Sequence, residues 1–234
     1  MKKLLLSLSV LASGFMVSAQ SVDEIVDKHI AAIGGKENWK KVNSMVMEGS
    51  LNVMGREVGV KITQVHNKGS RQDISVAGMS GYEITTPTGG WVFMPFQGQA
   101  KPEPIPAEAV KEALDDLDLH GNLVDYKEKG HTVELLGKED VEGTECFKIK
   151  VNRKNSGEQT IFVDPESYLI VRAISKRKAM GQEVEMKSDL SDYKEVNGVK
   201  VPFSVSQQFG TVVFSSIKIN EPVDEKLFAA PSSN

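Results

Sequence analysis

The sequence predicts a mainly β protein of the α+β class: an incomplete, strongly curved antiparallel β-barrel of about 11 strands, with helices as a lid over its concave face. Three observations lead to this prediction. Apolar and polar residues alternate along most of the chain from Val42 onward, tight-turn signals separate the alternating segments, and two segments have helical spacing. A single antiparallel sheet with one apolar face must curl around a core or be covered, and the two helices are the available cover.

The first 19 residues have the pattern of a secretory signal peptide. Two lysines precede an apolar run from Leu4 to Val17, and small residues lead to a cleavage site before Gln20. The run is short for a membrane span, and a lipid-anchored precursor would need a cysteine at the cut, whereas the single cysteine is Cys146. We therefore expect residues 1–19 to be removed and residues 20–234 to form a single exported, soluble domain.

The first helix is predicted from Ser21 to Ile33. Ser21 and Glu24 have the spacing of a capping box, in which each side chain bonds the backbone N–H of the other residue. Gly34-Gly35 ends the helix. One apolar stripe runs along it, formed by Val22, Ile25, Val26, His29, Ile30 and Ile33.

From Val42 the apolar period changes to 2, which predicts strands. Met45, Met47, Leu51 and Val53 share one face of the first strand, and Val58, Val60 and Ile62 repeat the pattern in the second. Turn signals such as Met54-Gly55 and Asn197-Gly198 indicate an antiparallel meander. Further strands are predicted near residues 91–94, 133–136, 146–151, 160–163, 169–174, 184–186, 203–207 and 212–219.

One segment interrupts the meander. The proline-rich stretch from Lys101 to Pro106 leads into a helix predicted from Pro106 to Leu119. Its apolar residues Val110, Ala113, Leu114 and Leu117 have i, i+3, i+4, i+7 spacing. His120-Gly121-Asn122 follows the helix as a stop signal.

The composition and motifs argue against several function classes. The formal net charge is −4, so the chain is not suited to hold nucleic acid or an anionic membrane by charge. The four histidines lack metal-ligand spacing, and the calcium-loop-like segment that starts at Asp116 has Lys127 where a glutamate is required. No nucleophile elbow, phosphate loop or dinucleotide motif is present. We expect no catalytic residues, no metal site and no cofactor.

Four segments in order resemble the LolA/LolB-like family of periplasmic lipoprotein carriers, in particular its outer-membrane lipoprotein-sorting proteins. They are GGWVFMPFQGQA (89–100), VDPESYLIVR (163–172), DYKEVNGVKVPF (192–203) and NEPVDEKLFAAP (220–231). The resemblance extends over most of the mature chain. It implies a periplasmic, non-enzymatic carrier, with helices as a lid over a hydrophobic cavity that takes acyl chains of lipoproteins or lipids for transfer to the outer membrane.

The expected site combines this resemblance with the apolar strand faces. The residues expected to line the cavity and bind lipid are Met45, Met47, Leu51, Val58, Val60, Ile62, Trp91 and Phe93. The residues expected in the lid are Ile25, Ile30, Val110, Leu114 and Leu117. The resemblance further implies an arginine that hydrogen-bonds the lid, and Arg71 is the matching position.

The partners that this interpretation implies are acyl chains and a delivery partner at the inner or outer membrane, with the carrier itself a monomer. Two alternatives stay open. The first is an envelope sensor or scaffold of the same fold, which would expose an apolar patch to a membrane-protein partner. The second is an enzyme acting on envelope lipid or glycan, which would need paired polar groups that face inward.

Overall fold

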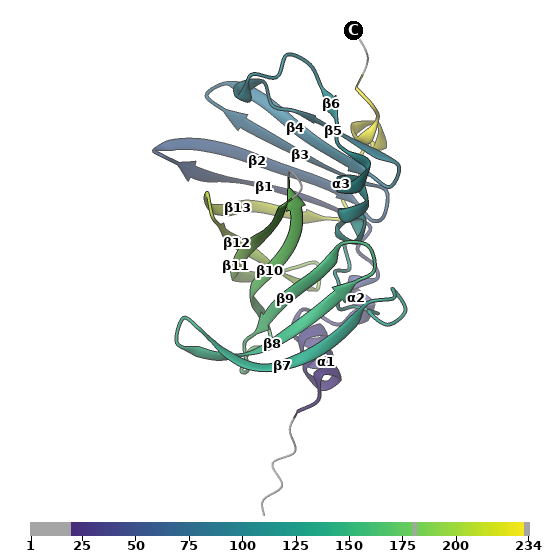
Figure 1. Cartoon of the computed structure of the whole chain (residues 1–234), viewed down its shortest axis with the longest axis vertical. Coiled ribbons are helices and arrows are strands. Elements are labelled where there is room, and N and C mark those ends of the chain that lie inside the picture. Colours follow the sequence, from purple (N-terminus) through teal and green to yellow (C-terminus); the bar gives the residue numbers. More distant parts are fainter. Residues whose placement is uncertain (1–19, 180–181, 232–234) are drawn as a thin grey trace, which may run out of the picture.

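The computed structural model describes residues 20–179 and 182–231, without the side chains of residues 177–183. The expected signal peptide therefore lies outside the described residues. The described residues form one 13-stranded antiparallel sheet in the order β6-β5-β4-β3-β2-β1-β13-β12-β11-β10-β9-β8-β7, and the sheet is strongly curved (Figure 1). Its edge strands β6 and β7 do not pair with each other in the described part, so the sheet stays open. The predicted fold class is confirmed, with 13 described strands instead of about 11.

The elements have the following bounds. The strands are β1 (Ser44–Val53), β2 (Arg56–Val65), β3 (Gly69–Val76), β4 (Met79–Thr86), β5 (Gly89–Phe93), β6 (Glu103–Pro104), β7 (Thr132–Val141), β8 (Thr144–Arg153), β9 (Gly157–Val163), β10 (Ile170–Ala179), β11 (Gln182–Val196), β12 (Val199–Gln207) and β13 (Gly210–Ile219). The helices are α1 (Val22–Ala32), α2 (Lys36–Trp39) and α3 (Ala107–Glu112), with the 3-10 helices η1 (Pro95–Gln97), η2 (Leu114–Leu117) and η3 (Glu225–Phe228).

Two meanders, β1 to β6 and β7 to β13, join through the pairing of β1 with β13. Directly opposed residues of an antiparallel pair lie on the same face of the sheet. Met47 pairs with Ile62 on one side and with Ile217 on the other, so these three residues share a face. We call this the inner face, because the helices pack against it, and the opposite one the outer face.

Helix α1 covers the inner face of one half of the sheet. Its capping box is present as predicted, with the Ser21 hydroxyl accepting from the Glu24 N–H and the Glu24 carboxylate accepting from the Ser21 N–H. The capped helix presents Ile25 and Val26, both essentially inaccessible to solvent, to Ile149 and Ile161 of β8 and β9. This packing forms one of the two large hydrophobic clusters of the molecule.

The second large cluster lies at the centre of the sheet, where α2 meets β1, β12 and β13. Its members include Trp39, Val42, Val199 and Phe214. The indole N–H of Trp39 donates to the carbonyl of Ile33 at 3.0 Å, which fixes the ring beneath the end of α1. Ile30 packs against both clusters, so the two form a continuous core.

The structure differs from the prediction in two regions. The sequence pattern does not indicate strands β3 and β4, because serine, threonine and glycine interrupt the alternation of apolar and polar residues in both. The single helix predicted from Pro106 to Leu119 breaks near Ala113 into α3 and η2. None of the described helices is long and apolar enough to cross a membrane.

Candidate binding cavity on the inner face

A cavity of about 460 Å³ lies on the inner face at the centre of the sheet. Strands β1, β2, β12 and β13 form its floor, and helix α2 and the segment after η2 contribute its cover. Its apolar lining consists of Met45, Met47, Val60, Ile62, Val201, Pro202, Val205, Val212, Phe214, Ile217, Trp39 and Leu119. This volume falls within the usual range of a small-molecule site, roughly 300 to 1,000 Å³.

Polar groups at the cavity are few, and Gln64, Asp116, Asp118 and Gln207 among them are engaged with the protein. The side-chain amide of Gln64 donates to the carbonyl of Asp116 at 2.8 Å. The carboxylate of Asp118 pairs with the ammonium of Lys129 at 2.6 Å. Gln72 and Gln207 complete the polar lining together with Asp116. The cavity is thus suited to an apolar ligand with a polar group at its margin.

A short segment, residues 114–120, crosses one end of the cavity, and we call it the strap. It includes η2, and its middle part is fastened to the sheet on both sides. Toward β2 and β3, the N–H of Asn67 donates to the carbonyl of Leu117 at 2.9 Å, beside the Gln64 contact. Toward β8 and β9, the strap is held by Asp115 and Asp116.

The Asp115 carboxylate accepts three hydrogen bonds from the turn between β8 and β9. The donors are the backbone N–H of Asn155 at 2.8 Å, its side-chain amide at 2.8 Å and the backbone N–H of Ser156 at 2.7 Å. Burial alone would raise the pKa of Asp115, but the hydrogen bonds from Asn155 and Ser156 outweigh it and hold the pKa below its usual range. Next to it, the buried guanidinium of Arg153 pairs with Asp116 at 3.0 Å.

Two histidines and one carboxylate meet where the strap contacts the turn between β2 and β3. The rings of His66 and His120 stack with centroids 3.9 Å apart. Oδ1 of Asp118 lies 3.4 Å from Nδ1 of His66 and 3.8 Å from Nδ1 of His120. Burial lowers the pKa of His66, with a further contribution from His120, so this imidazole is neutral at neutral pH.

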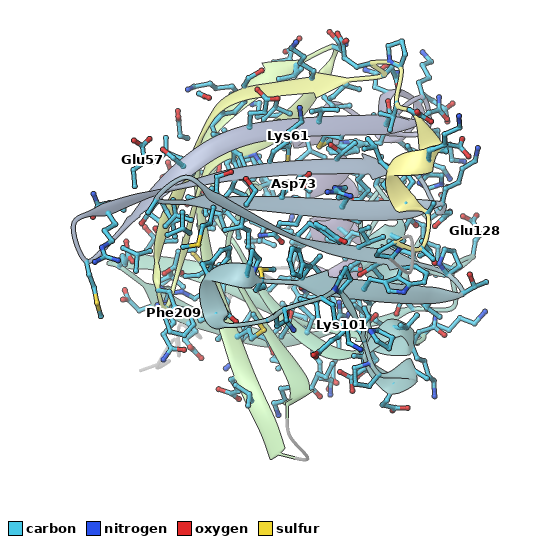
Figure 2. The ribbon with its side chains drawn as sticks, turned by 90° about the horizontal axis from the view of Figure 1, so that it is seen from above. Glu57, Lys61, Asp73, Lys101, Glu128 and Phe209 are labelled. Atoms are coloured by element: carbon cyan, nitrogen blue, oxygen red, sulfur yellow. The ribbon has the colours of Figure 1, made fainter. Side chains whose placement is uncertain are left out.

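A second hollow, of about 600 Å³, lies at the hairpin ends. Val184 and Met186 of β11 and Phe209 of the β12–β13 turn border it, and all three are exposed, Phe209 to 78%. In Figure 2, Phe209 lies on the opposite side of the molecule from Glu128. Gln207 borders both hollows, so the exposed apolar ends lie next to the central cavity.

The residues expected to line the cavity fall into three groups. Met45, Met47, Val60 and Ile62 line it. Leu51 and Val58 pair with each other on the same inner face, nearer to the β1–β2 turn, beyond the lining of the cavity.

Trp91 and Phe93 require a correction, because they lie on the outer face. Trp91 is in register with Ile84, which is opposite Arg71, and Phe93 packs against Tyr82 with ring centroids 5.8 Å apart. Strand β5 has apolar residues on both faces, so its alternation could not indicate which face turns inward. Trp91 borders a separate pocket of about 360 Å³ beside α3.

The residues expected in the lid lie in different parts of the fold. Ile25 is a core residue on the buried face of α1, and Ile30 joins the two core clusters. Val110 and Leu114 border the pocket beside α3, and Leu117 is a buried residue of the strap itself. None of these five borders the central cavity, whose described cover comes from Trp39, Asp116, Asp118 and Leu119.

Arg71 does not bond α3 or the strap in any described contact, which corrects the expectation that it holds the lid. Its guanidinium pairs with Asp73 at 2.8 Å, lies 4.3 Å from the centre of the Tyr82 ring and reaches the carbonyl of Leu227 in η3. Arg71 is directly opposite Thr63 in the register of β2 and β3, and the neighbouring opposed residues on the same outer face are Lys61 and Asp73, which Figure 2 labels. It therefore fastens the C-terminal segment to the back of the sheet.

Sequence reasoning missed several lining residues. Val205, Val212 and Ile217 lie in segments predicted as strands, and their inner face follows only from the pairing of β1 with β13. Trp39 and Leu119 lie outside the strands, so no apolar period marks them. His66 and Asp118 are far apart in the sequence, and only the folded strap brings them together.

No family model matches the sequence, and no curated protein matches it either. Solved structures are similar over most of the chain. A LolA superfamily protein from Nitrosomonas europaea has a TM-score of 0.55, with 12% sequence identity over 91% of this chain and 99% of that chain. A domain described as outer membrane lipoprotein-sorting, from Vibrio parahaemolyticus, has a TM-score of 0.50 and 16% identity over 88% and 94%.

A DUF1329 family protein from Desulfovibrio piger is also similar, with a TM-score of 0.55 and 17% identity over 89% of this chain and 97% of that one. At such identities the likeness concerns the fold alone. The resemblance noted in the sequence is thus confirmed at that level: the chain has the open, curved sheet found in a LolA superfamily protein and in a lipoprotein-sorting domain.

Proposed function

We propose that this protein is a non-enzymatic periplasmic carrier that holds acyl chains of a lipoprotein or lipid in its central cavity for transfer to the outer membrane. The observation that carries the proposal is the apolar cavity on the inner face, which shares the lining residue Gln207 with the hollow bordered by Phe209. The export signal expected in residues 1–19 and the fold shared with a lipoprotein-sorting domain agree with this role.

The energetics suit reversible carriage. Burial of an acyl chain contributes about 0.8 kcal/mol per methylene, so about ten buried methylenes supply about 8 kcal/mol. That figure corresponds to a micromolar dissociation constant before the costs of ordering are subtracted. Met45 and Met47 in the floor are flexible side chains that can adapt to chains of different shape. Such a site retains a lipid and still releases it to a tighter acceptor.

An adjacent pair of valines on β13 provides a sharp test. Val212 lines the cavity, whereas Val213 lies on the opposite face and is 53% exposed. Val212→Phe should place the ring in empty space, weaken binding of a fluorescent fatty-acid probe by about tenfold or more, and leave the folded state as stable as before. Val213→Phe should bind the probe like the wild type.

The measurement is probe titration of the mature chain, residues 20–234, with thermal unfolding of each variant as the stability control. Equal affinities of the two variants would show that the cavity is not the binding site. A wild-type protein that binds neither the probe nor co-purified lipid in native mass spectrometry would overturn the carrier role.

A sensor or scaffold that contacts a membrane-protein partner is the second candidate. The observation in its favour is the exposure of large apolar side chains at the hairpin ends, with Met54 98% exposed and Phe209 78%. This candidate predicts that Phe209→Ser abolishes partner binding, whereas Val212→Phe has no effect on it.

A further inference from the structure

The fold brings His66, Asp118 and His120 into one cluster at the end of the strap. His66 lies in the turn after β2, and the other two residues lie directly after η2. The strap and the turn are held together by the bond from the Asn67 N–H to the Leu117 carbonyl. The cluster is therefore a fixed meeting point of two separate segments.

The hydrogen bonds around the cluster indicate which ring nitrogens carry a proton and which accept one. Nε2 of His120 lies 3.2 Å from the carbonyl of Val42, and because a carbonyl only accepts, this nitrogen carries the proton. The backbone N–H of Leu119 donates to Nδ1 of His66 at 3.3 Å, so this nitrogen is an acceptor and Nε2 of His66 carries the proton. The side-chain amide of Asn67, 2.9 Å from that Nε2, can accept through its oxygen when it is turned.

Three atoms that can bind a metal ion consequently converge within 4.8 Å of one another: Nδ1 of His66, Nδ1 of His120 and Oδ1 of Asp118. Asp118 Oδ1 is 3.4 Å and 3.8 Å from the two nitrogens. Ligands of a tetrahedral ion with bonds of about 2.0 to 2.1 Å lie about 3.3 Å apart, so any of these atoms that stand further apart, up to 4.8 Å, must move together to close the site. Lys129 pairs with the other carboxylate oxygen, Oδ2, whereas Oδ1 accepts from the backbone N–H of His120 at 2.8 Å and keeps a second lone pair.

We propose that His66, His120 and Asp118 form a binding site for a divalent transition-metal ion of the Zn²⁺ class, with an open fourth position for water. Two imidazole nitrogens and one carboxylate oxygen suit Zn²⁺ and do not suit the oxygen-seeking ions Ca²⁺ and Mg²⁺. The contacts of the outer nitrogens with Val42 and Asn67 are the kind that orient metal-binding histidines.

Binding requires that one ring tilts and that Nδ1 of His66 gives up its hydrogen bond from the Leu119 N–H, because this nitrogen has a single lone pair. The two rings are nearly parallel, with planes 16° apart, and a metal ion lies close to the plane of each ring that ligates it. One ring must therefore tilt. The side chain of His66 is 24% exposed against 14% for His120, which is also held by Val42, so His66 is the ring that turns. The ion would then join the β2–β3 turn to the strap that covers the cavity.

The test uses the mature chain, freed of metal with a chelator, and Zn²⁺ alone as the ligand. Competition with a chromophoric chelator should show one Zn²⁺ per chain with a dissociation constant below about 0.1 mM. Asp118→Asn and His120→Gln should weaken binding by about 100-fold. Lys129→Gln should tighten it, because the carboxylate is no longer partly neutralised by an ammonium.

His131 provides the matched control, since it is a buried histidine whose Nδ1 accepts from the Lys154 N–H. His131→Gln should bind Zn²⁺ like the wild type, and circular dichroism verifies the fold of each variant. In the wild type, Zn²⁺ should shift the imidazole ¹⁵N resonances of His66 and His120 and leave those of His29 and His131 in place. Binding weaker than about 1 mM, unchanged affinity in the cluster variants, or shifts at His29 or His131 instead would overturn the proposal.

Discussion

His29 illustrates how a residue that looks like a candidate ligand in the sequence is a structural group in the fold. It belongs to the apolar stripe of α1 and is only 5% exposed. Its Nδ1 lies 2.8 Å from the carbonyl of Tyr168, so this nitrogen carries the proton and donates it. Burial lowers the pKa of His29, and the hydrogen bond to Tyr168 only partly opposes this effect. The ring thus stays neutral in the folded protein.

A pH dependence of stability follows from this lowered pKa. Below the unfolded-state pKa of 6.5, the unfolded chain takes up a proton that the folded protein resists. The stabilisation is therefore complete above that pH and is lost as the pH falls below it, with a slope of up to about 1.4 kcal/mol per pH unit for one group. His29→Gln keeps a donor for Tyr168 and removes the titration.

Urea unfolding at several pH values between about 7 and 5 measures this effect, because His29 titrates in that range. The slope of the unfolding free energy against pH should be smaller in His29→Gln than in the wild type. His66 and His131 also have lowered pKa values, and their contribution is common to both proteins. Identical slopes would mean that His29 does not contribute.

At the level of elements, the predictable parts are those in which local chemistry and burial agree. Helix α1 followed from its capping box and apolar stripe, and the inner face of β1 and β2 followed from an alternation that one-sided burial imposes. Strands β3 and β4 were not predicted, because polar residues on one strand lie opposite polar residues on the other, as Gln72 does with Glu83, and such strands show little alternation of apolar and polar residues. The break of the second helix depends on contacts that the local sequence does not contain.

The site was predictable to a similar degree. A period of 2 identified Met45, Met47, Val60 and Ile62, but it could not orient β5, which is apolar on both faces. Position in three dimensions decides the rest: Trp39, Leu119 and the cluster of His66 with Asp118 come together only when the strap crosses the strand ends. Arg71 matched a family position, yet its local partner Asp73, two residues along the same strand, holds it on the outer face.

The contribution of the strap to stability can be tested at Asp115. The carboxylate of this residue, in η2, accepts three hydrogen bonds from N–H groups of the β8–β9 turn. Asp115→Ala removes these charge-assisted bonds and should lower the free energy of unfolding by about 2 kcal/mol. Residues 114–120 should then exchange their amide protons faster than in the wild type.

Glu108→Ala is the matched control, because Glu108 is an exposed acidic residue on nearby α3. It should change stability by less than about 0.5 kcal/mol. Denaturant titration and hydrogen exchange of the three proteins give the comparison. An Asp115→Ala protein as stable as Glu108→Ala, with unchanged exchange in the strap, would show that Asp115 does not fasten it.

For the whole molecule, the two halves of the sheet are covered unequally. Strands β8 and β9 pack against α1 on the inner face, and on the outer face their residues Cys146 and Phe162 are buried in a small cluster with Val141 of β7. Strands β3 to β6 end at an open edge and have thinner cover, from α3 and η3 (Figure 1). The half of the sheet that packs against α1 should therefore resist local unfolding more than the other half. The cavity lies where the two halves meet.

Hydrogen exchange read by mass spectrometry should show this asymmetry, because amide protons exchange through local opening wherever buried contacts are few. In the free protein, β8 and β9 should exchange slowest and β4 to β6 fastest. If the central cavity holds acyl chains, a saturating fatty acid should slow exchange in β1, β2, β12, β13 and the strap, and should leave β8 and β9 unchanged. Equal protection of both halves in the free protein would contradict the unequal cover, whereas ligand protection confined to β8 and β9 would place the acyl site under α1 and away from the cavity.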